Sequence, residues 1–313
     1  MSEAAELKSR PCPVCGSSVE SEALFESRID AAKLGAFSYA SRKTPELMHH
    51  ALRLCRTCGD LFASPAPSPE FLAERYRTAS FDSGTESRYA AQSYYESLVR
   101  LSRLSGRELM RSECCLDVGC GDGAFLAQAL ADGWSDAVGL EPSAEPIRQA
   151  TPDVRRRIVQ ATFGTEAVPA RRYSLVTCFQ TLSHVPDPLA IATSAHRLLS
   201  PGGCFFAVEH DWRAPLNRLF GRRSPIYDIE HLQLFEGRSI RALFKASGFE
   251  RIRVVPLVNR YPVGYWLRLA PVPAPLKAWL LRTPWLRRLM GLSIAIPAGN
   301  MACIGFKAGR ALA

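Results

Sequence analysis

The sequence predicts an α/β protein whose main part is a Rossmann-like sheet of strands alternating with helices, preceded by a small metal-binding module. Two observations carry this prediction. The apolar stretch Cys114–Val118 runs into a glycine-rich turn and then into a segment with apolar residues at helical spacing, which is the unit that builds nucleotide-binding α/β sheets. Near the N-terminus, two C-x2-C pairs are each followed by glycine, a spacing typical of metal knuckles.

Composition excludes several classes of protein. The chain has 313 residues, of which 47 % are hydrophobic and 22 % charged, so it can bury a core and is not a disordered chain. No apolar run reaches the roughly 18 residues that cross a bilayer, and the first residues have no apolar stretch of the secretory type. With ten cysteines and no such stretch, we expect a reducing, cytoplasmic location.

The net charge of +9 comes from the C-terminal part of the chain. Residues 1–250 hold 29 Lys and Arg against 30 Asp and Glu, a net of −1, whereas residues 251–313 hold 10 Lys and Arg and no acid, a net of +10. Such a block indicates a local anionic partner: a membrane surface, a phosphorylated substrate or, less favoured, nucleic acid.

Four of the cysteines form the two pairs, Cys12 with Cys15 in CPVCG and Cys55 with Cys58 in CRTCG. Two thiolates of one tight turn can face one metal ion, and two such turns complete a tetrahedral four-cysteine zinc site of the structural type. We therefore predict a zinc-binding module and linker over residues 1–75, with 20–48 as a strand-and-loop excursion. Four incidental thiols or a redox pair are the alternatives.

The remaining six cysteines lie in or beside apolar runs and are expected to be small core residues. After the second pair, Ser68 is expected to cap a helix that begins with Pro69. Residues 76–111 are predicted to be a helical linker.

The glycine-rich turn follows the strand at Gly119, Gly121 and Gly123. Glycine lets the backbone pass close under a ligand and lets the next helix pack against the strand. Alone, the G-x-G-x-G spacing would be weak evidence of a nucleotide site.

Carboxylates strengthen that prediction and indicate the kind of nucleotide. A second apolar strand, 137–140, ends in Glu141, where a carboxylate accepts the ribose hydroxyls. Asp117 and Asp122 flank the turn and would repel a phosphate. A nucleoside with a positive centre and no phosphate fits these charges, and S-adenosylmethionine (SAM) is such a nucleoside.

Around these residues the sequence resembles the class I SAM-dependent methyltransferases. LDVGCGDG resembles their first motif and GLEP their second, while YSLVTCFQTLSHVPDP, LLSPGGCFFAVE, FKASGFERIRVV and GNMACIGFKA resemble the segments around strands four to seven. The resemblance covers roughly residues 112–313 and implies a seven-stranded sheet whose last strand is antiparallel. Ser174 and Ser183 stand where members often have Asp and Glu, a departure on the substrate side.

The layout also resembles a narrower group, in which a four-cysteine zinc domain precedes the methyltransferase. CRTCGDLFASPAPSPEFLAERY and IYDIEHLQLF resemble segments of the sugar C-methyltransferases and of related envelope-polysaccharide methyltransferases. The sugar enzymes carry a further C-terminal domain, so the resemblance implies methyl transfer to a nucleotide- or lipid-linked sugar without specifying the reaction. The alternatives are an O-methyltransferase of another natural product or lipid, and a zinc-containing binding protein that has lost catalysis.

Nucleic acid is not an expected partner. Residues 1–75 lack a basic stripe with interleaved aromatics. The Asn/Asp-Pro-Pro-aromatic motif of exocyclic-amine methylation is absent where QTLSHVPDP stands. We therefore expect a small-molecule acceptor.

The resemblance also assigns the expected cofactor contacts. Asp117 is expected near the methionine ammonium or the amides of the turn, Thr162 at the adenine after the third strand, and Phe179 and Gln180 at adenine or methionine after the fourth. For Phe179 a core position is an equal alternative. The full predicted set is Asp117, Gly119, Gly121, Gly123, Glu141, Thr162, Phe179 and Gln180.

Removing a proton from the acceptor requires a base, and histidine suits this because its pKa lies near 6.5. His231 is the first candidate and His184 the second, because both follow the carboxyl ends of predicted strands. Glu230 and Tyr227 are expected to orient the base or bind sugar hydroxyls, with a solvated loop as the alternative. The other histidines are not expected to take the proton. His210 is expected to be a capping or orienting residue, His196 an ordinary helix position, and His49 and His50, in or beside the module excursion, surface residues.

An insertion at 261–297 separates the last two strands of the predicted methyltransferase domain, 112–313. It contains Trp266, Trp279 and Trp285, interleaved with basic residues, and its prolines are expected to cut it into short helices. It is expected to be either a lid over the cleft or an element lying in the headgroup layer at the inner face of a membrane. Both hold if the acceptor is lipid-linked.

Overall fold

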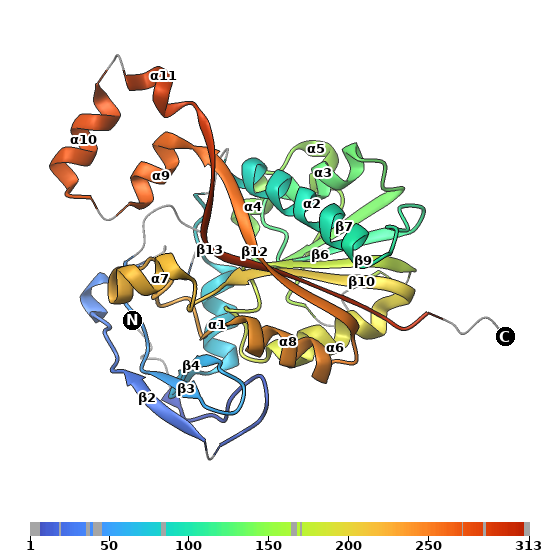
Figure 1. Ribbon diagram of the computed structural model, residues 1–313, viewed down its shortest axis with the longest axis horizontal. Coiled ribbons are helices and arrows are strands. Elements are labelled where there is room, and N and C mark those ends of the chain that lie inside the picture. Colours follow the sequence, from blue (N-terminus) through green and yellow to red (C-terminus); the bar gives the residue numbers. More distant parts are fainter. Residues whose placement is uncertain are drawn as a thin grey trace.

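The computed structural model describes residues 7–18, 20–35, 38–39, 46–82, 86–163, 168–169, 171–270, 272–283 and 286–309. A seven-stranded sheet with the order β12-β13-β10-β9-β6-β7-β8 lies at its centre (Figure 1). Its strands are β6 (Cys114–Val118), β7 (Asp136–Glu141), β8 (Ile158–Gln160), β9 (Tyr173–Phe179), β10 (Leu199–His210), β12 (Glu250–Pro262) and β13 (Ser293–Phe306). β6 to β10 are parallel and β13 is antiparallel to both of its neighbours, which confirms the predicted sheet.

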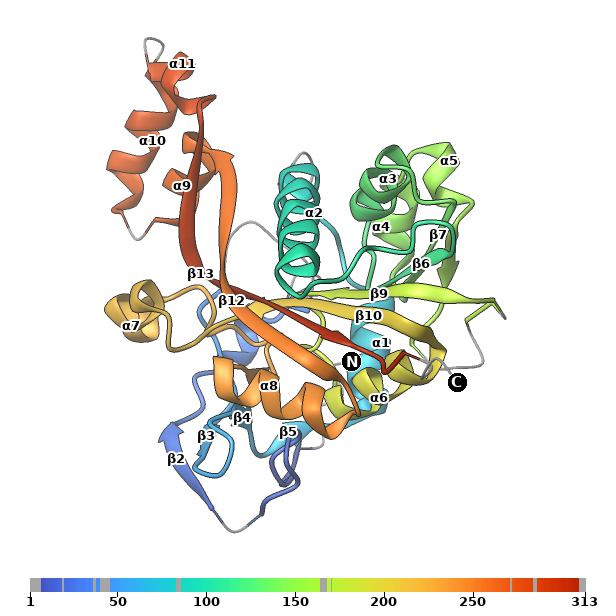
Figure 2. The same ribbon diagram turned by 45° about the vertical axis from the view of Figure 1, so that its right-hand side comes forward.

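Helices cover both faces of the sheet, as Figures 1 and 2 show. On one side lie α2 (Glu86–Leu104), α3 (Ala124–Ala131), α4 (Ala144–Gln149) and α5 (Pro152–Arg155), and on the other α1 (Pro69–Arg77), α6 (Pro188–Leu198) and α8 (Gly237–Ala246). Successive side chains of a strand point to opposite faces, so Cys115 and Leu116 of β6 belong to the two different core layers. All six unpaired cysteines are buried in these layers, as predicted.

The N-terminal module is built on a second sheet, with the order β11-β4-β3-β2. Its strands are β2 (Ser21–Phe25), β3 (Leu52–Cys55), β4 (Leu61–Ala63) and β11 (Gln233–Leu234), and β1 (Leu7–Lys8) pairs separately with β5 (Ala66–Pro67). The fourth strand therefore comes from a segment far downstream. Ser68 caps α1 by accepting from the Phe71 amide, and Pro69 begins that helix, as predicted.

The β12–β13 hairpin extends beyond the sheet as an arm. β10 pairs with β13 only from Asn300 to Phe306, whereas β12 follows β13 back to Ser293. Figures 1 and 2 show the helices α9 (Val263–Leu269), α10 (Ala274–Arg282) and α11 (Arg287–Met290) at its far end. The predicted division of the insertion into short helices is confirmed, while Trp285 and the side chains of Arg287 and Arg288 lie outside the described residues.

Two short elements follow β10, α7 (Pro215–Phe220) and the 3-10 turn Gly221–Arg223, and a further 3-10 turn spans Ala31–Lys33. Across the described residues, none of the helices combines the length and the apolar character that a membrane crossing requires.

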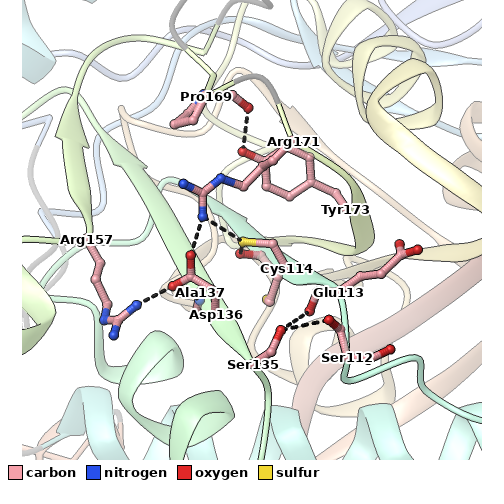
Figure 3. A network of polar contacts seen from close by, with 11 residues as sticks. Ser112, Glu113, Cys114, Ser135, Asp136, Ala137, Arg157, Pro169, Arg171 and Tyr173 are labelled. Carbon is pink, nitrogen blue, oxygen red and sulfur yellow. Dashed lines mark hydrogen bonds and ion pairs between the residues drawn. The ribbon is translucent and has the colours of Figure 1, made fainter.

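A polar network closes the amino-terminal edge of the sheet (Figure 3). Asp136, the first residue of β7, accepts hydrogen bonds from Arg157 and Arg171. The Ser135 hydroxyl donates to the Ser112 and Glu113 carbonyls at 2.9 and 3.2 Å. These groups form hydrogen bonds with one another. In a sheet of this type a ligand site is expected at the opposite edge, where the strands have their carboxyl ends.

Candidate functional site

A cavity of about 490 Å³ lies at the carboxyl edge of the sheet. Its walls come from the turn after β6, the ends of β7, β9 and β10, the start of α2, the loop 225–231 and the arm. One end therefore holds the glycine turn, and the other holds residues that are far apart in sequence.

The glycine turn presents its backbone to the cavity. Gly119 and Gly121, with φ of 74° and 55°, both line it. A Cβ on Gly119 would stand 2.4 Å from the Thr181 hydroxyl, so a side chain has no room there. Gly123 has another role, because it begins α3 and a Cβ there would stand 2.2 Å from Val154. Two of the three predicted glycines thus face the cavity, and the third permits packing.

Glu141 ends β7 and lies beside the turn, as expected. Its carboxylate accepts from the amides of Gly121 and Ser143, both at 2.9 Å. Burial raises its pKa above the usual range, and these two bonds act in the opposite direction. Each carboxylate oxygen keeps a second lone pair, so Glu141 can still accept hydroxyl hydrogens from a ligand in the cavity.

Asp117 and Thr162 do not lie where they were expected. Asp117 is 1 % exposed, lies beneath the turn and accepts from the Thr177 hydroxyl of β9 at 2.7 Å. Burial raises the pKa of its carboxyl to about 7. Thr162 is exposed, two residues beyond the end of β8. Neither lines the cavity. The Asp117 carboxylate is held by Thr177 of the neighbouring strand β9, and β8 ends two residues before Thr162.

Phe179 and Gln180 line the cavity at the end of β9. The Phe179 ring packs between Tyr94 and Phe125, with centroid distances of 4.8 and 4.6 Å, so it is at once a core residue and a wall. Gln180 adopts a φ of 51°, and its backbone N–H donates to the Val208 carbonyl at 2.8 Å. At this residue the chain leaves β9 and reaches the rim of the cavity.

The other end of the cavity gathers three histidines and a glutamate. His184, Glu230 and His231 each offer one ligand atom, and these three atoms lie within 4.8 Å of one another. The His231 ring stands 5.0 Å from that of His184 and 5.1 Å from that of His210. The sequence placed these residues after different strands, and the fold brings them together.

Neighbouring groups hold this cluster in place. Tyr76 of α1 stacks on His184 with the rings 7° from parallel, and its hydroxyl donates to the carbonyls of His184 and Glu230 at 3.4 and 3.3 Å. His210 Nδ1 lies 2.7 Å from Asn300 Oδ1, which holds its ring. Burial lowers the pKa of His210 to about 4, so this ring is neutral at neutral pH.

Tyr227 does not belong to the cavity. Its ring packs against Phe25 at 5.2 Å and His49 at 6.4 Å within the N-terminal module, and burial raises its pKa to about 12. The prediction that it orients the base is therefore wrong, because the loop turns Tyr227 toward the module and Glu230 toward the cavity. His49 and His50 are likewise buried and not on the surface, whereas His196 lies in α6 as expected.

Several lining residues had no signal in the sequence. Aromatic side chains come from two loops, α1, α2 and the arm, and asparagines from the hairpin strands: Tyr39, Phe81, Tyr76, Tyr94, Tyr261, Tyr265, Asn259 and Asn300. Trp266, which the sequence placed in the insertion, also lines the cavity. Asn259 is 3 % exposed, and its Oδ1 has no hydrogen-bond partner among the described residues. No local pattern in the sequence indicates that these elements meet at one cavity.

Charge is distributed unevenly over the lining. Five carboxylate residues and no Lys or Arg occur among the described residues of the wall: Asp82, Glu86, Glu141, Asp228 and Glu230. Such a wall suits a cationic ligand and disfavours a phosphate.

Arg10, two residues before Cys12, connects the module to the histidine loops. Its guanidinium donates to the Pro186 carbonyl at 3.0 Å, to the Leu232 carbonyl at 2.7 Å and to Gln233 Oε1 at 3.0 Å. A further bond, at 2.8 Å, goes to the Ala63 carbonyl of the module. One half-buried side chain thus contacts the loop after His184, the residue after His231 and the module.

The four paired cysteines converge in the module. The sulfurs of Cys12 and Cys58 lie 3.5 Å apart, as do those of Cys15 and Cys55, and all four lie within 4.8 Å of one another. Tetrahedral zinc with bonds of about 2.3 Å requires sulfurs about 3.8 Å apart. The donor set and its spacing therefore fit one structural zinc ion.

Residues 88–254 match the model of the methyltransferase domain family, more than half of the chain. The chain belongs to the methyltransferase domain family. It is 36 % identical over 115 residues to a ubiquinone biosynthesis O-methyltransferase of Pectobacterium carotovorum, covering 34 % of this chain and 48 % of that protein. A protein of the same name from Psychrobacter arcticus is 35 % identical over 170 residues, covering 49 % and 65 %. The chain thus spans less than two thirds of either relative.

Among solved structures, the fold of this methyltransferase family member is similar to that of a SAM-dependent methyltransferase from Archaeoglobus fulgidus. The two are 15 % identical, with a TM-score of 0.44, and the match covers 77 % of this chain and all of that one.

Proposed function

We propose that this protein is a SAM-dependent methyltransferase that methylates a hydroxyl-bearing, sugar-like small molecule. The observation that carries the proposal is the single cavity that joins the glycine turn and Glu141 to the cluster of His184, Glu230 and His231. A cofactor end and an end with groups able to take a proton are what a methyl transfer to a hydroxyl needs.

The cofactor end supports SAM. Glu141 is placed to accept the ribose hydroxyls, and the backbone at Gly119 and Gly121 allows close approach. The carboxylate-rich wall suits the positive sulfonium and ammonium groups of SAM. When bound, SAM supplies an activated methyl group, so the protein has only to align the acceptor, exclude water and take a proton.

The acceptor end supports proton removal by histidine. His231 is our candidate for the general base, since it is buried in the cluster between His184 and His210. Glu230 is placed to orient it or to bind acceptor hydroxyls, and Tyr76 holds His184 by stacking. His184 is the second candidate for the base.

The lining supports an acceptor with hydroxyls and a flat or ring-shaped body. Tyrosine and tryptophan rings can cover a sugar or an aromatic ring, and the buried Asn259 Oδ1 can accept a hydroxyl hydrogen. Because the described wall has no Lys or Arg, the diphosphate of a nucleotide-linked sugar would lie outside the cavity.

An O-methyltransferase of an aromatic or lipid acceptor is the second candidate. The names of the relatives, ubiquinone biosynthesis O-methyltransferases, favour it, as do the many aromatic side chains of the wall. A binding protein without catalysis is disfavoured, because both ends of the cavity retain their groups.

Calorimetry with SAM followed by turnover tests these candidates. We expect SAM to bind in a 1:1 complex and NAD not to bind. Methyl transfer would then be measured on nucleotide-linked sugars, lipid-linked sugars and dihydroxylated aromatic compounds. Turnover of the aromatic compounds alone would replace the sugar proposal by the second candidate, and SAM binding with no turnover on any acceptor class would favour the third.

We propose further that Cys12, Cys15, Cys55 and Cys58 hold one structural zinc ion. Four thiolates close the coordination shell and leave no position for a substrate. The ion would stabilise the module next to Arg10.

A further inference from the structure

The helical end of the β12–β13 arm has two parts that differ. In the first part, Tyr261 of β12 and Tyr265 and Trp266 of α9 pack on one another with centroid distances of 4.4 to 5.8 Å and line the cavity. Arg268 of α9 also pairs with Glu86 of α2 at 2.8 Å. These contacts make α9 part of the cavity wall and join it to the body of the protein.

Beyond α9 the arm exposes large apolar side chains to solvent. Leu276 and Trp279 of α10 are 46 % and 57 % exposed, and they share one face of the helix because they are three residues apart. Leu289, Leu292 and Ile294 add 47 %, 56 % and 40 % on α11 and the start of β13. Figures 1 and 2 both show α10 and α11 projecting away from the sheet and the module.

The same segment carries only positive charge. From residue 251 to residue 313 the chain has ten Lys and Arg and no acid, and four of the ten lie after α9 and up to the end of α11. Lys277 follows Leu276 and Arg282 lies three residues after Trp279, so basic residues flank the apolar stripe of α10. Exposed tryptophan and leucine between cations match the headgroup layer of an anionic membrane, where rings enter the interface and cations meet lipid phosphates.

We propose that the tip of the arm, residues 274–283 and 286–294, docks this protein on an anionic lipid surface while α9 stays at the cavity. The arm then has two parts with different tasks: α9 forms a wall of the site, and α10 with α11 forms the surface contact. The inference does not depend on the identity of the acceptor.

Vesicle binding by the full-length protein tests the proposal. We expect co-sedimentation with phosphatidylcholine vesicles that contain about a third phosphatidylglycerol, weak binding to phosphatidylcholine alone, and weakening with added salt. Trp279→Asp is expected to reduce the partition coefficient at least tenfold, and Arg282→Gln about fivefold, the usual effect of one cation near such a surface.

Leu104→Asp is the matched control, because Leu104 is 52 % exposed at the end of α2 and lies outside the arm. It is expected to bind vesicles like the unchanged protein. Unchanged SAM affinity and melting temperature in the Trp279 variant would show that its fold is intact. Equal binding to neutral and anionic vesicles, or full binding by Trp279→Asp, would overturn the proposal. So would self-association without lipid that the same variant abolishes, since the tip would then be an interface between copies of this chain.

Discussion

The two ends of the cavity are assembled in different ways. The cofactor end is local: Gly119, Gly121 and Glu141 lie within one strand–turn–helix–strand unit, and Gly121 bonds directly to Glu141. The acceptor end is gathered from α1, two loops after different strands, and the arm. A local unit keeps its geometry by its own backbone bonds, whereas a gathered site depends on every element that holds it. Mutations should therefore separate cofactor binding from turnover.

The largest expected separation comes from the proposed base. His231→Ala should lower kcat by about 10²–10⁴-fold, the usual contribution of a positioned general base, and leave the Kd of SAM within twofold. Calorimetry and steady-state kinetics with the true acceptor measure the two effects. A parallel His184→Ala variant decides between the two histidines. Near-normal rates in both would exclude a histidine base.

Arg10→Ala tests whether the module holds the acceptor end. Loss of its part-buried bonds to the Pro186 and Leu232 carbonyls should lower kcat by roughly 5- to 150-fold, equivalent to about 1–3 kcal/mol, with little change in SAM affinity. Arg10→Lys, which keeps the charge and part of the bonding, should recover part of the rate. The Arg53 guanidinium donates to Ser21 within the module, and Arg53→Ala is the control variant. Equal effects of Arg10→Ala and Arg53→Ala would contradict a positioning role.

The proposed zinc ion also tests whether the module supports the acceptor end of the cavity. Metal analysis of the pure protein should find one zinc per chain, and Cys55→Ser should lower that content and the rate before it affects SAM binding, because the proposed metal would stabilise the module. Absence of zinc from the pure protein would refute the assignment.

Glu141→Ala should affect the other end of the cavity and weaken the binding of SAM. Loss of its proposed bonds to the ribose should raise the Kd of SAM by roughly 5- to 150-fold, about 1–3 kcal/mol. Gln160, exposed at the end of the neighbouring strand β8, offers the control Gln160→Ala, which should bind SAM normally. Unchanged affinity in the Glu141 variant would remove that residue from the site.

The smallest effect on function is expected at Asp117. Burial raises its pKa to about 7 in the folded protein, against about 3.9 in an unfolded chain. The folded state therefore holds the proton more tightly, and Asp117 makes the protein lose stability as pH rises from about 4 to 7, with no further change above. In SAM-free protein, Asp117→Asn should flatten the free energy of unfolding over that window, measured by urea titration, and leave SAM affinity within twofold. A large loss of SAM affinity would restore the predicted cofactor contact.

The sequence determined by itself what depends on neighbours along the chain. The apolar strand and the glycine turn predicted a Rossmann-like unit, and the resemblance to class I methyltransferases implied its seven strands. Ser68 and Pro69 predicted the start of α1, and apolar surroundings predicted the six buried cysteines. Glu141 was predicted at the carboxyl edge of the sheet because it ends a predicted strand, and the carboxyl ends of parallel strands lie at the same edge. Each of these predictions depends on spacing over a few residues, where backbone geometry leaves few choices.

Only the tertiary structure decided which side chains meet. It turned Tyr227 into the module and Asp117 under the turn, left Thr162 outside the cavity, and brought Tyr76 and the arm to the histidines. Such positions follow from how separate elements pack, and packing depends on the whole core and not on local spacing. For this protein, the glycine turn and Glu141 of the cofactor end therefore come from one segment of the chain. The acceptor end forms only when the module, the loops and the arm pack together.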